Sequence, residues 1–255
     1  MSEHAIIHPS ARIAPNVTIG PGTIIGADVE IGEGTWIGPH VVIQGPTVIG
    51  KNNKIFQFAS VGDEPQDITY KGEPTSLVIG DHNIIREFCM ISRGTVKGGG
   101  LTKIGNHNFF MAYSHIGHDC MVGNYVTLVN YSALSGHVVV DDYASIGAYA
   151  AIHQFCLIGA YAFIARATYV SKDVLPYVMI AGHLTSACGI NTVGLKRRGF
   201  SSAAVDILRR AYKIIFRKGL TVQQAMAELE ILLPECPEVQ PLIDALNQST
   251  RGIVR

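Results

Sequence analysis

The chain has 255 residues, and its 20 basic and 20 acidic side chains cancel, which gives no general attraction to nucleic acid. Its five cysteines lie at irregular spacings, so the sequence indicates neither a disulfide framework nor a structural zinc site. The first residues show no basic region followed by an apolar run, as a secretory signal would. We therefore expect a cytoplasmic protein that binds any charged ligand through local clusters of charged side chains.

An apolar residue recurs at every sixth position over most of the chain. The series covers residues 7–61, resumes in phase over 79–91, and continues after an out-of-phase insertion over 104–170. This period excludes a helix, whose apolar face repeats about every 3.6 residues, and fits short strands joined by turns. It also explains the uncharged stretch 143–165 as buried repeats, so we expect no membrane span.

Such short strands bury their apolar faces only by coiling and stacking on one another. The pattern resembles the hexapeptide-repeat, left-handed parallel β-helix, in which three hexads form one triangular coil; the left hand follows from the resemblance alone. We expect this β-helix over residues 1–190, with inserted loops at about 62–78 and 97–103. A small α-helical C-terminal domain should follow over residues 191–255.

Capping residues predict three helices in this second domain. Ser201 or Ser202 can cap a helix that runs to about Lys218. Thr221 and Gln224 have the spacing of a capping box for a second helix, and a third is expected over about 239–247.

Positions 18 residues apart should stack in successive coils, about 4.8 Å apart. One such column contains His118, Gly136 and Gln154. His137 and His153 flank this column, and His115 precedes His118 by three residues. The sequence therefore predicts a surface ridge of four imidazoles and one amide.

Three interpretations of this ridge compete. It could be a solvated polar surface without a function. It could bind zinc, as in the γ-class carbonic anhydrases, which place histidines on the same fold. It could also supply the general base of an acyltransferase.

Further stretches favour the third interpretation. They are 56–60 (FQFAS), 72–75 (GEPT), 93–95 (RGT), 98–103 (GGGLTK), 115–119 (HIGHD), 153–155 (HQF), 194–200 (GLKRRGF) and 249–252 (STRG). On these residues, nearly the whole chain resembles the UDP-N-acetylglucosamine acyltransferase family, which begins lipid A biosynthesis. The resemblance implies a homotrimer with active sites between neighbouring β-helices. It also implies transfer of an R-3-hydroxyacyl group from acyl carrier protein to the sugar's 3-hydroxyl, with no metal and no cofactor beyond the carrier's phosphopantetheine arm.

The resemblance assigns roles to individual residues. His118 is expected to be the general base, Asp119 its orienting partner, and the Gly136 N–H the donor to the oxyanion. The 18-residue column independently puts Gly136 next to His118. The expected substrate-binding residues are Asp67, His115, His137 and Gln154 for the sugar and diphosphate, His153 for the acyl arm, and Asn191, Arg197 and Arg198 for the nucleotide.

One residue and one cluster of residues are expected to interact with the acyl donor. Arg166 replaces a glycine that helps to set acyl length in the family, so we expect a shorter chain of about ten to twelve carbons. A second group lies on the first helix of the C-terminal domain and could dock the acidic carrier protein: Arg209, Arg210, Lys213 and Arg217, with Lys218 beside them.

Three more positions depart from the family pattern and leave the acceptor open. Thr69 stands where a sugar-site lysine is common, Ser92 where a histidine is common, and Val193 where a glutamate is frequent. The acceptor could therefore be a 3-amino sugar in place of the 3-hydroxyl. The sequence also leaves open a zinc-dependent lyase of the γ-carbonic anhydrase type, an acetyl-CoA-dependent transferase of the same fold, and a solenoid used only for binding.

Overall fold

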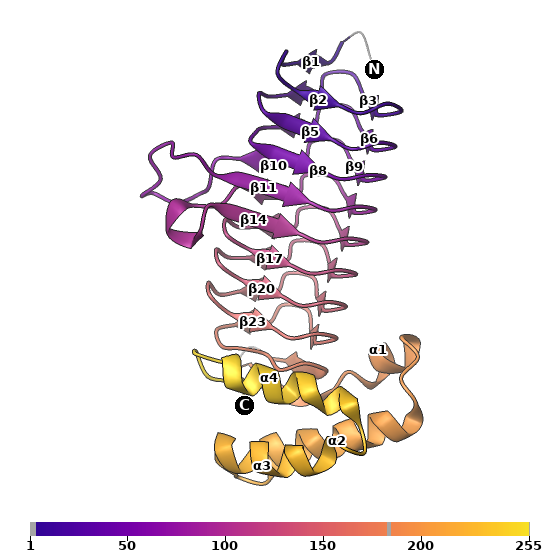
Figure 1. The fold of residues 1–255 in the computed structure, drawn as a ribbon, viewed down its shortest axis with the longest axis vertical. Coiled ribbons are helices and arrows are strands. Elements are labelled where there is room, and N and C mark those ends of the chain that lie inside the picture. The colour runs from indigo at the N-terminus through magenta and orange to yellow at the C-terminus, as the bar shows by residue number, and fades with distance from the viewer. Residues whose placement is uncertain (1–3, 183–184, 255) are drawn as a thin grey trace.

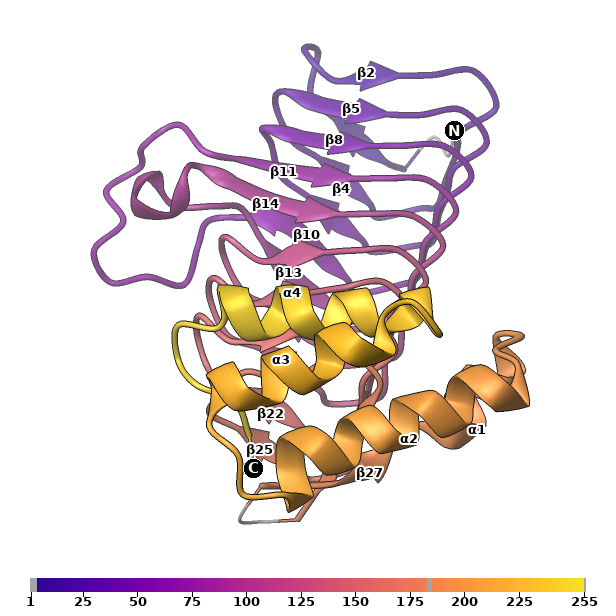
Figure 2. The same cartoon turned by 60° about the horizontal axis from the view of Figure 1, so that its bottom comes forward.

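The computed structural model describes residues 4–182 and 185–254. Over most of its length the chain winds as a tall triangular coil, and each turn of the coil contributes one short strand to each of three parallel sheets (Figure 1). The α-helices lie together at the C-terminal end of this coil (Figure 2). No helix in the described part of the chain is long and apolar enough to cross a membrane.

From β1 to β25 the three sheets take every third strand in turn, and β26 and β27 then both join sheet C. Sheet A consists of β1 (Ile6–Ile7), β4 (Ile24–Ile25), β7 (Val42–Ile43), β10 (Ser60–Asp63), β13 (Met90–Ser92), β16 (His115–Ile116), β19 (Ala133–Leu134), β22 (Ala151–Ile152) and β25 (Tyr169–Val170). Sheet B consists of β2 (Arg12–Ile13), β5 (Val29–Ile31), β8 (Thr47–Ile49), β11 (Ser76–Ile79), β14 (Leu101–Ile104), β17 (Met121–Val122), β20 (Val139–Val140) and β23 (Leu157–Ile158). Sheet C consists of β3 (Thr18–Ile19), β6 (Trp36–Ile37), β9 (Lys54–Ile55), β12 (Ile84–Ile85), β15 (Phe109–Phe110), β18 (Thr127–Leu128), β21 (Ser145–Ile146), β24 (Phe163–Ile164), β26 (Val178–Ala181) and β27 (Ser186–Ile190).

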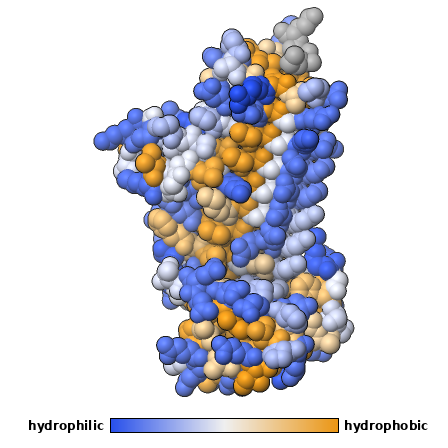
Figure 3. All heavy atoms as spheres, viewed as in Figure 1, coloured by the Kyte–Doolittle hydropathy of each residue, from blue (hydrophilic) through white to orange (hydrophobic). Residues whose placement is uncertain are grey.

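The hexad residues form the core of the coil, as the period of six predicts. From Ile19 to Val170 no residue of the series is more than 4% exposed. Ile116 pairs with Leu134, 18 residues further on, and Leu134 pairs with Ile152 in the same register. Because strand side chains alternate, the residue before each hexad residue points outward. Figure 3 shows that the outer face of sheet B is largely apolar, with a column of polar turn residues along one side.

Turns connect the sheets along three edges, here called corners AB, BC and CA after the sheets that they join. A non-glycine residue with positive φ occupies most of these turns, such as Asp119 (60°) and His137 (63°) at corner AB. This backbone conformation is uncommon for such residues. Hydrogen bonds between coils hold it here; the His137 N–H, for example, donates to the His118 carbonyl at 2.9 Å.

Both inserted loops replace turns at corner AB. The first connects β10 to β11 across residues 64–75, and the second connects β13 to β14 across residues 93–100 and contains the short 3-10 helix η1 (Val96–Gly98). Figure 1 shows the two loops projecting from the same side of the coil. Their bounds differ from the expected 62–78 and 97–103, because residues 76–78 and 101–103 pair with each other as strands β11 and β14.

The C-terminal region closes the coil with a hairpin and helices. It contains α1 (Thr192–Arg197), α2 (Ser202–Arg217), α3 (Val222–Leu232), η2 (Pro237–Val239) and α4 (Gln240–Gln248). The Ser201 side chain caps α2, and Thr221 forms with Gln224 the capping box expected for α3. The antiparallel pairing of β26 with β27 and the short helix α1 were not predicted from the sequence. The tail returns to the coil, where the Ser249 hydroxyl donates to the buried Asp173 carboxylate.

Candidate active site

The histidines of the predicted ridge gather at corner AB, one coil below the second inserted loop. His118 and Asp119 form the turn between β16 and β17, and Gly136 and His137 form the same turn in the next coil. The repeat itself therefore brings these four residues together, since equivalent turns stack at 18-residue intervals.

His118 and Asp119 make a direct hydrogen bond although they are adjacent in sequence. The His118 Nδ1 lies 2.8 Å from Asp119 Oδ2. A carboxylate can only accept, so Nδ1 carries the proton and Nε2 of the neutral ring is left as a base. The Asp119 side chain is 1% exposed and that of His118 is 16% exposed. This is the arrangement of a histidine base oriented by a buried carboxylate.

The second inserted loop holds Asp119 in place. Asp119 Oδ1 accepts a hydrogen bond of 2.7 Å from the Thr95 N–H, and Oδ2 accepts one of 2.6 Å from the Thr95 hydroxyl. The Asp119 N–H donates to Thr102 Oγ1 at 2.8 Å. Gly98 also packs closely, because a Cβ at this position would lie 2.1 Å from Asp119 Cγ. These contacts fix the carboxylate without leaving a buried charge unpaired.

His137 lies against His118 and Asp119 from the coil below. Its Nε2 is 3.7 Å from Asp119 Oδ2, and its ring meets that of His118 edge to face at 5.1 Å. The Phe155 ring stacks on that of His137 with a centroid distance of 4.3 Å. Burial lowers the pKa of His137 below that of an ordinary histidine, with the Asp119 charge acting in the opposite direction. His137 is therefore suited to act as a neutral hydrogen-bonding group.

Gly136 faces the His118 ring, as the column predicts. A Cβ at position 136 would lie 2.6 Å from His118 Nε2, so only glycine leaves room for the ring. Among the described residues, none accepts a hydrogen bond from the Gly136 N–H. This donor is therefore available beside His118 Nε2 for a hydrogen bond to an anionic oxygen.

The remaining described residues of the predicted ridge make no hydrogen bond, ion pair or ring contact with the His118–Asp119 pair. His115 lies on the outer face of sheet A between Met90 and Ala133, and burial lowers the pKa of its imidazole. His153 bonds the Tyr169 hydroxyl at 3.2 Å, and Gln154 is exposed.

The first inserted loop brings Asp67 toward the same corner. Its Oδ1 accepts from both the N–H and the hydroxyl of Thr69, each at 2.8 Å. The pKa of the Asp67 carboxyl is lowered chiefly by the Thr69 N–H, and electrostatic interactions with Lys97 and His118 contribute to the same shift. Asp67 thus belongs to the electrostatic surroundings of His118.

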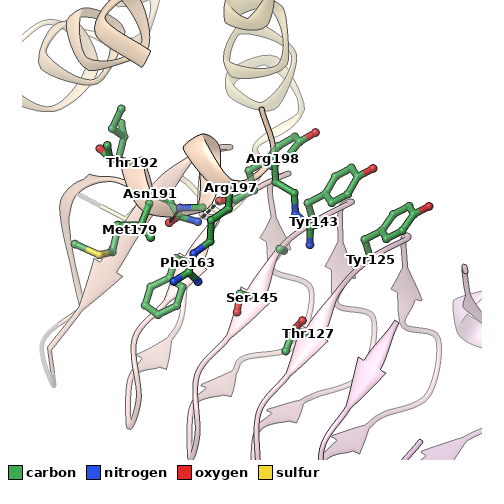
Figure 4. A pocket seen from close by; sticks show the side chains of 15 residues that line it. Tyr125, Thr127, Tyr143, Ser145, Phe163, Met179, Asn191, Thr192, Arg197 and Arg198 are labelled. Atoms are coloured by element: carbon green, nitrogen blue, oxygen red, sulfur yellow. Dashed lines mark hydrogen bonds between the residues drawn. The ribbon is translucent and has the colours of Figure 1, made fainter. Parts of the chain in front are cut away.

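A separate pocket of about 550 Å³ lies at corner BC and over the outer face of sheet C. Asn191, Arg197 and Arg198 line it, as Figure 4 shows, and we call it the arginine pocket. The Arg198 guanidinium lies 4.7 Å from the ring centroid of Tyr143. Asn191 caps α1 by accepting from the Gly194 N–H at 3.0 Å. Two arginines beside an aromatic ladder can bind a phosphorylated aromatic ligand.

We call His118, Asp119, Gly136 and His137 the catalytic corner, because they are the candidate catalytic residues. The catalytic corner and the arginine pocket lie on different edges of the triangular coil. None of the described residues that line the arginine pocket belongs to the catalytic corner. One copy of the chain therefore does not bring the predicted nucleotide-binding residues to the predicted base.

The residues predicted to act on the acyl donor lie elsewhere. Arg166 is exposed at corner CA, just after β24. The expected docking residues on α2 are exposed, but most already have partners: Arg209 pairs with Asp206, Arg210 with Glu235 and Lys218 with Glu228. Arg217 donates to the Ala187 carbonyl and to Tyr212 Oη, so it also connects α2 to β27.

His118, Asp119 and His137 each place a possible metal ligand within 4.8 Å of the others. The carboxylate of this group already accepts hydrogen bonds from Thr95 and His118. A metal ion would have to displace the His118 contact to use Asp119 Oδ2. The donor set therefore fits a hydrogen-bonded dyad better than a metal centre.

Sequence reasoning missed three contributors to these sites. Thr95 and Thr102 hold Asp119, and Tyr143 stacks on Arg198. The tyrosine could have been found by the 18-residue arithmetic, since Tyr125, Tyr143 and Tyr161 follow one another at that interval. The threonines gave no such signal, because they lie in or beside a loop that breaks the repeat.

Comparisons with known proteins agree with this architecture. The family model described as Udp N-acetylglucosamine O-acyltransferase, domain 2, matches residues 173–254, and the bacterial transferase hexapeptide model matches residues 1–32, 28–63 and 101–136. The acyl-[acyl-carrier-protein]–UDP-N-acetylglucosamine O-acyltransferases of Stutzerimonas stutzeri and Pseudomonas aeruginosa are each 54% identical to this chain, over 98% of it and 97% of their own length.

Solved structures give the same result. LpxA from Acinetobacter baumannii is 50% identical, with a TM-score of 0.98 over 100% of this chain and 99% of its own. The UDP-N-acetylglucosamine acyltransferase of Francisella novicida is 47% identical, with a TM-score of 0.97 over 100% of this chain and 93% of its own. The coil is thus the expected left-handed parallel β-helix followed by a small helical domain. The chain belongs to the UDP-N-acetylglucosamine O-acyltransferase family.

Proposed function

We propose that this protein transfers an R-3-hydroxyacyl group from acyl carrier protein to the 3-hydroxyl of UDP-N-acetylglucosamine, the first step of lipid A biosynthesis. The family membership supports the reaction. The observation that carries the mechanism is the His118–Asp119 dyad, with the Gly136 N–H beside it and without an acceptor among the described residues. No cofactor is needed beyond the phosphopantetheine arm of the carrier.

His118 acts as the general base of the transfer. Its Nε2 removes the proton of the sugar hydroxyl as the oxygen attacks the thioester carbonyl. The Gly136 N–H donates to the oxyanion of the tetrahedral intermediate. When the intermediate collapses, the carbon–sulfur bond breaks and the thiolate of the carrier arm takes the proton from His118. The Asp119 carboxylate stabilises the imidazolium that exists between these two proton transfers.

The surrounding residues bind the two substrates. Asp67, His115, His137 and Gln154 contact the sugar and the diphosphate, and His153 contacts the acyl arm. Asn191, Arg197 and Arg198 bind the nucleotide in the arginine pocket. Their guanidinium groups suit a phosphate, and the tyrosine ladder suits the base ring.

The separation of these two groups supports a homotrimer. Corner AB carries the base, whereas the arginine pocket lies over sheet C and corner BC. A cyclic arrangement of three copies, in which corner AB of one copy faces sheet C of the next, completes each site. Corner CA then points toward the three-fold axis.

Corner CA carries side chains that suit such a contact. Phe58, Phe88, Tyr113, Tyr131 and Tyr149 stack in series with centroid distances of 4.7–5.0 Å. Each of these rings is at least 43% exposed in a single copy, and such a continuous aromatic surface is a candidate for burial between subunits. The mass in solution checks this part of the proposal: three chain masses are expected, and a monomer would contradict it.

The test of the function is an acyl-transfer assay. Purified protein is given 3-hydroxyacyl carrier protein of several chain lengths with either UDP-N-acetylglucosamine or its 3-amino analogue. The proposal expects transfer to the hydroxyl sugar at one preferred length. Transfer only to the amino sugar would change the acceptor, and transfer from acetyl-CoA alone would contradict the donor. Activity that is lost with a chelator and restored by zinc would favour a zinc-dependent reaction.

A further inference from the structure

The two inserted loops meet through one lysine that the assigned roles leave unused. Lys97 lies in η1 of the second loop, and its Nζ donates to Thr69 Oγ1 of the first loop at 2.8 Å. Among the described residues, no carboxylate lies within 4 Å of this ammonium group. The charge of Lys97 is therefore not neutralised by an ion pair within the described part of the chain.

The contact continues to Asp67. Thr69 Oγ1 accepts from Lys97 and donates to Asp67 Oδ1 at 2.8 Å, so that three side chains form one relay. Among the described residues, only Oδ1 of Asp67 is engaged, because the Thr69 N–H donates to the same oxygen. The relay thus presents a free carboxylate oxygen at one end and free ammonium protons at the other. Vicinal sugar hydroxyls, which both donate and accept, match such a pair.

The position of Lys97 is set by the catalytic carboxylate. Thr95, two residues earlier, binds Asp119 with both its N–H and its hydroxyl and also caps η1 by accepting from the Gly98 N–H. Gly98 itself packs on Asp119. The lysine is therefore carried by a turn that is fixed to the dyad on both sides.

We propose that Lys97 binds the sugar of the acceptor substrate together with Asp67, and supplies to this site the positive charge that Thr69 lacks. This inference rests on the proposed function, because it assumes that a sugar nucleotide occupies corner AB. Lys97 is a binding residue in this scheme, and the proton transfers remain with His118.

Isothermal titration measures the proposed role without activity. Lys97→Met should weaken binding of UDP-N-acetylglucosamine roughly tenfold or more, the loss expected for one hydrogen bond from a charged group. Binding of UDP, which lacks the sugar, should stay within about twofold of the wild type if the lysine acts on the sugar alone. Lys51→Met removes an exposed lysine at corner BC and serves as the matched control.

A charge-exchange variant distinguishes sugar binding by the ammonium group from a purely structural role of the Lys97–Thr69 contact between the loops. Thr69→Lys combined with Lys97→Gln moves the ammonium from the second loop to the first and should restore most of the affinity lost in Lys97→Gln. Unchanged sugar-nucleotide binding in Lys97→Met would overturn the inference. Equal losses for UDP and UDP-N-acetylglucosamine, or no recovery in the exchange variant, would also overturn it.

The same titration distinguishes this inference from the proposed reaction. If the wild type binds UDP-N-acetylglucosamine but transfers no acyl group, the reaction is wrong, while a weaker Lys97→Met complex still supports the lysine. If the wild type transfers acyl groups normally and Lys97→Met binds as tightly as the wild type, only the lysine assignment fails.

Discussion

Gly136→Ala tests the geometry of the catalytic corner without removing any functional group. The new Cβ would lie 2.4 Å from His118 Cε1 and 2.6 Å from Nε2. Nonbonded carbon atoms pack at about 3.5–4.0 Å, so the imidazole must move by about 1 Å or more. A displacement of this size in a catalytic group costs about 100-fold in rate. We expect kcat/KM for acyl transfer to fall by about this factor.

The fold should tolerate this substitution. The backbone at Gly136 lies outside the left-handed region, so alanine can adopt it without strain. Thermal unfolding should therefore occur within a few degrees of the wild type. A double-mutant cycle gives the sharper check: adding Gly136→Ala to His118→Ala should cause no further loss, since the group that it displaces is gone. Near wild-type turnover in Gly136→Ala would refute the reasoning.

The structure supports four more predictions. Asp119→Asn keeps one acceptor oxygen, which the Thr95 N–H engages, so that the amide NH2 faces His118 Nδ1 and favours the wrong tautomer of the ring. The transfer assay should show kcat lowered by about 100-fold or more; unchanged kcat would exclude an orienting role. Burial lowers the folded-state pKa of His115 below the ordinary 6.5, so the unfolded chain binds more protons and the free energy of unfolding should fall as pH drops below about 6.5. Urea unfolding at several pH values should show that this free energy depends less on pH in His115→Asn than in the wild type. The same pH dependence in both proteins would contradict the prediction. Arg166→Gly should shift the preferred acyl chain to greater length, as measured by competition among carrier substrates of different chain lengths. An unaltered preference would exclude a role of Arg166 in setting acyl length. Arg209→Glu with Lys213→Glu should raise KM for the acyl carrier about fivefold or more at low salt and leave KM for the sugar nucleotide unchanged; equal KM values for the carrier would argue against docking on α2.

The choice of residues in the docking test comes from the structure. From the sequence alone, Arg217 is expected to dock the carrier protein in the same way as its neighbours, because it lies on the same basic stretch of one helix. In the structure its guanidinium donates to the Ala187 carbonyl and to Tyr212 Oη, which connects α2 to the hairpin. Reversing its charge would disturb packing as well as any docking, so a loss of activity would not be interpretable.

The coil was predictable because its period is a property of the sequence alone. Each hexad position is apolar for one reason, burial inside the coil, and 18-residue arithmetic then gives the neighbours of every turn residue. This is why the contact between His118 and Gly136 could be expected before any coordinates. The same arithmetic places both inserted loops at corner AB, since each follows a strand of sheet A.

The contacts within the loops could not be predicted in this way. The hydrogen bonds of Thr95 to Asp119 and of Lys97 to Thr69 depend on how two irregular segments pack against each other. Neither segment has a periodic pattern that would fix its side chains. The short helix α1 and the β26–β27 hairpin were missed for a similar reason, because the Gly-containing stretch that forms them has little intrinsic preference.

The most direct measurement is acyl transfer from 3-hydroxyacyl carrier protein to UDP-N-acetylglucosamine by the wild type and by His118→Ala. The account predicts transfer that is selective for chain length in the wild type, and a loss of about 1,000-fold or more in the variant, because His118 is the histidine whose Nδ1 proton is held by Asp119 and whose Nε2 lies beside Gly136. A His118→Ala variant that retains wild-type turnover would contradict the account.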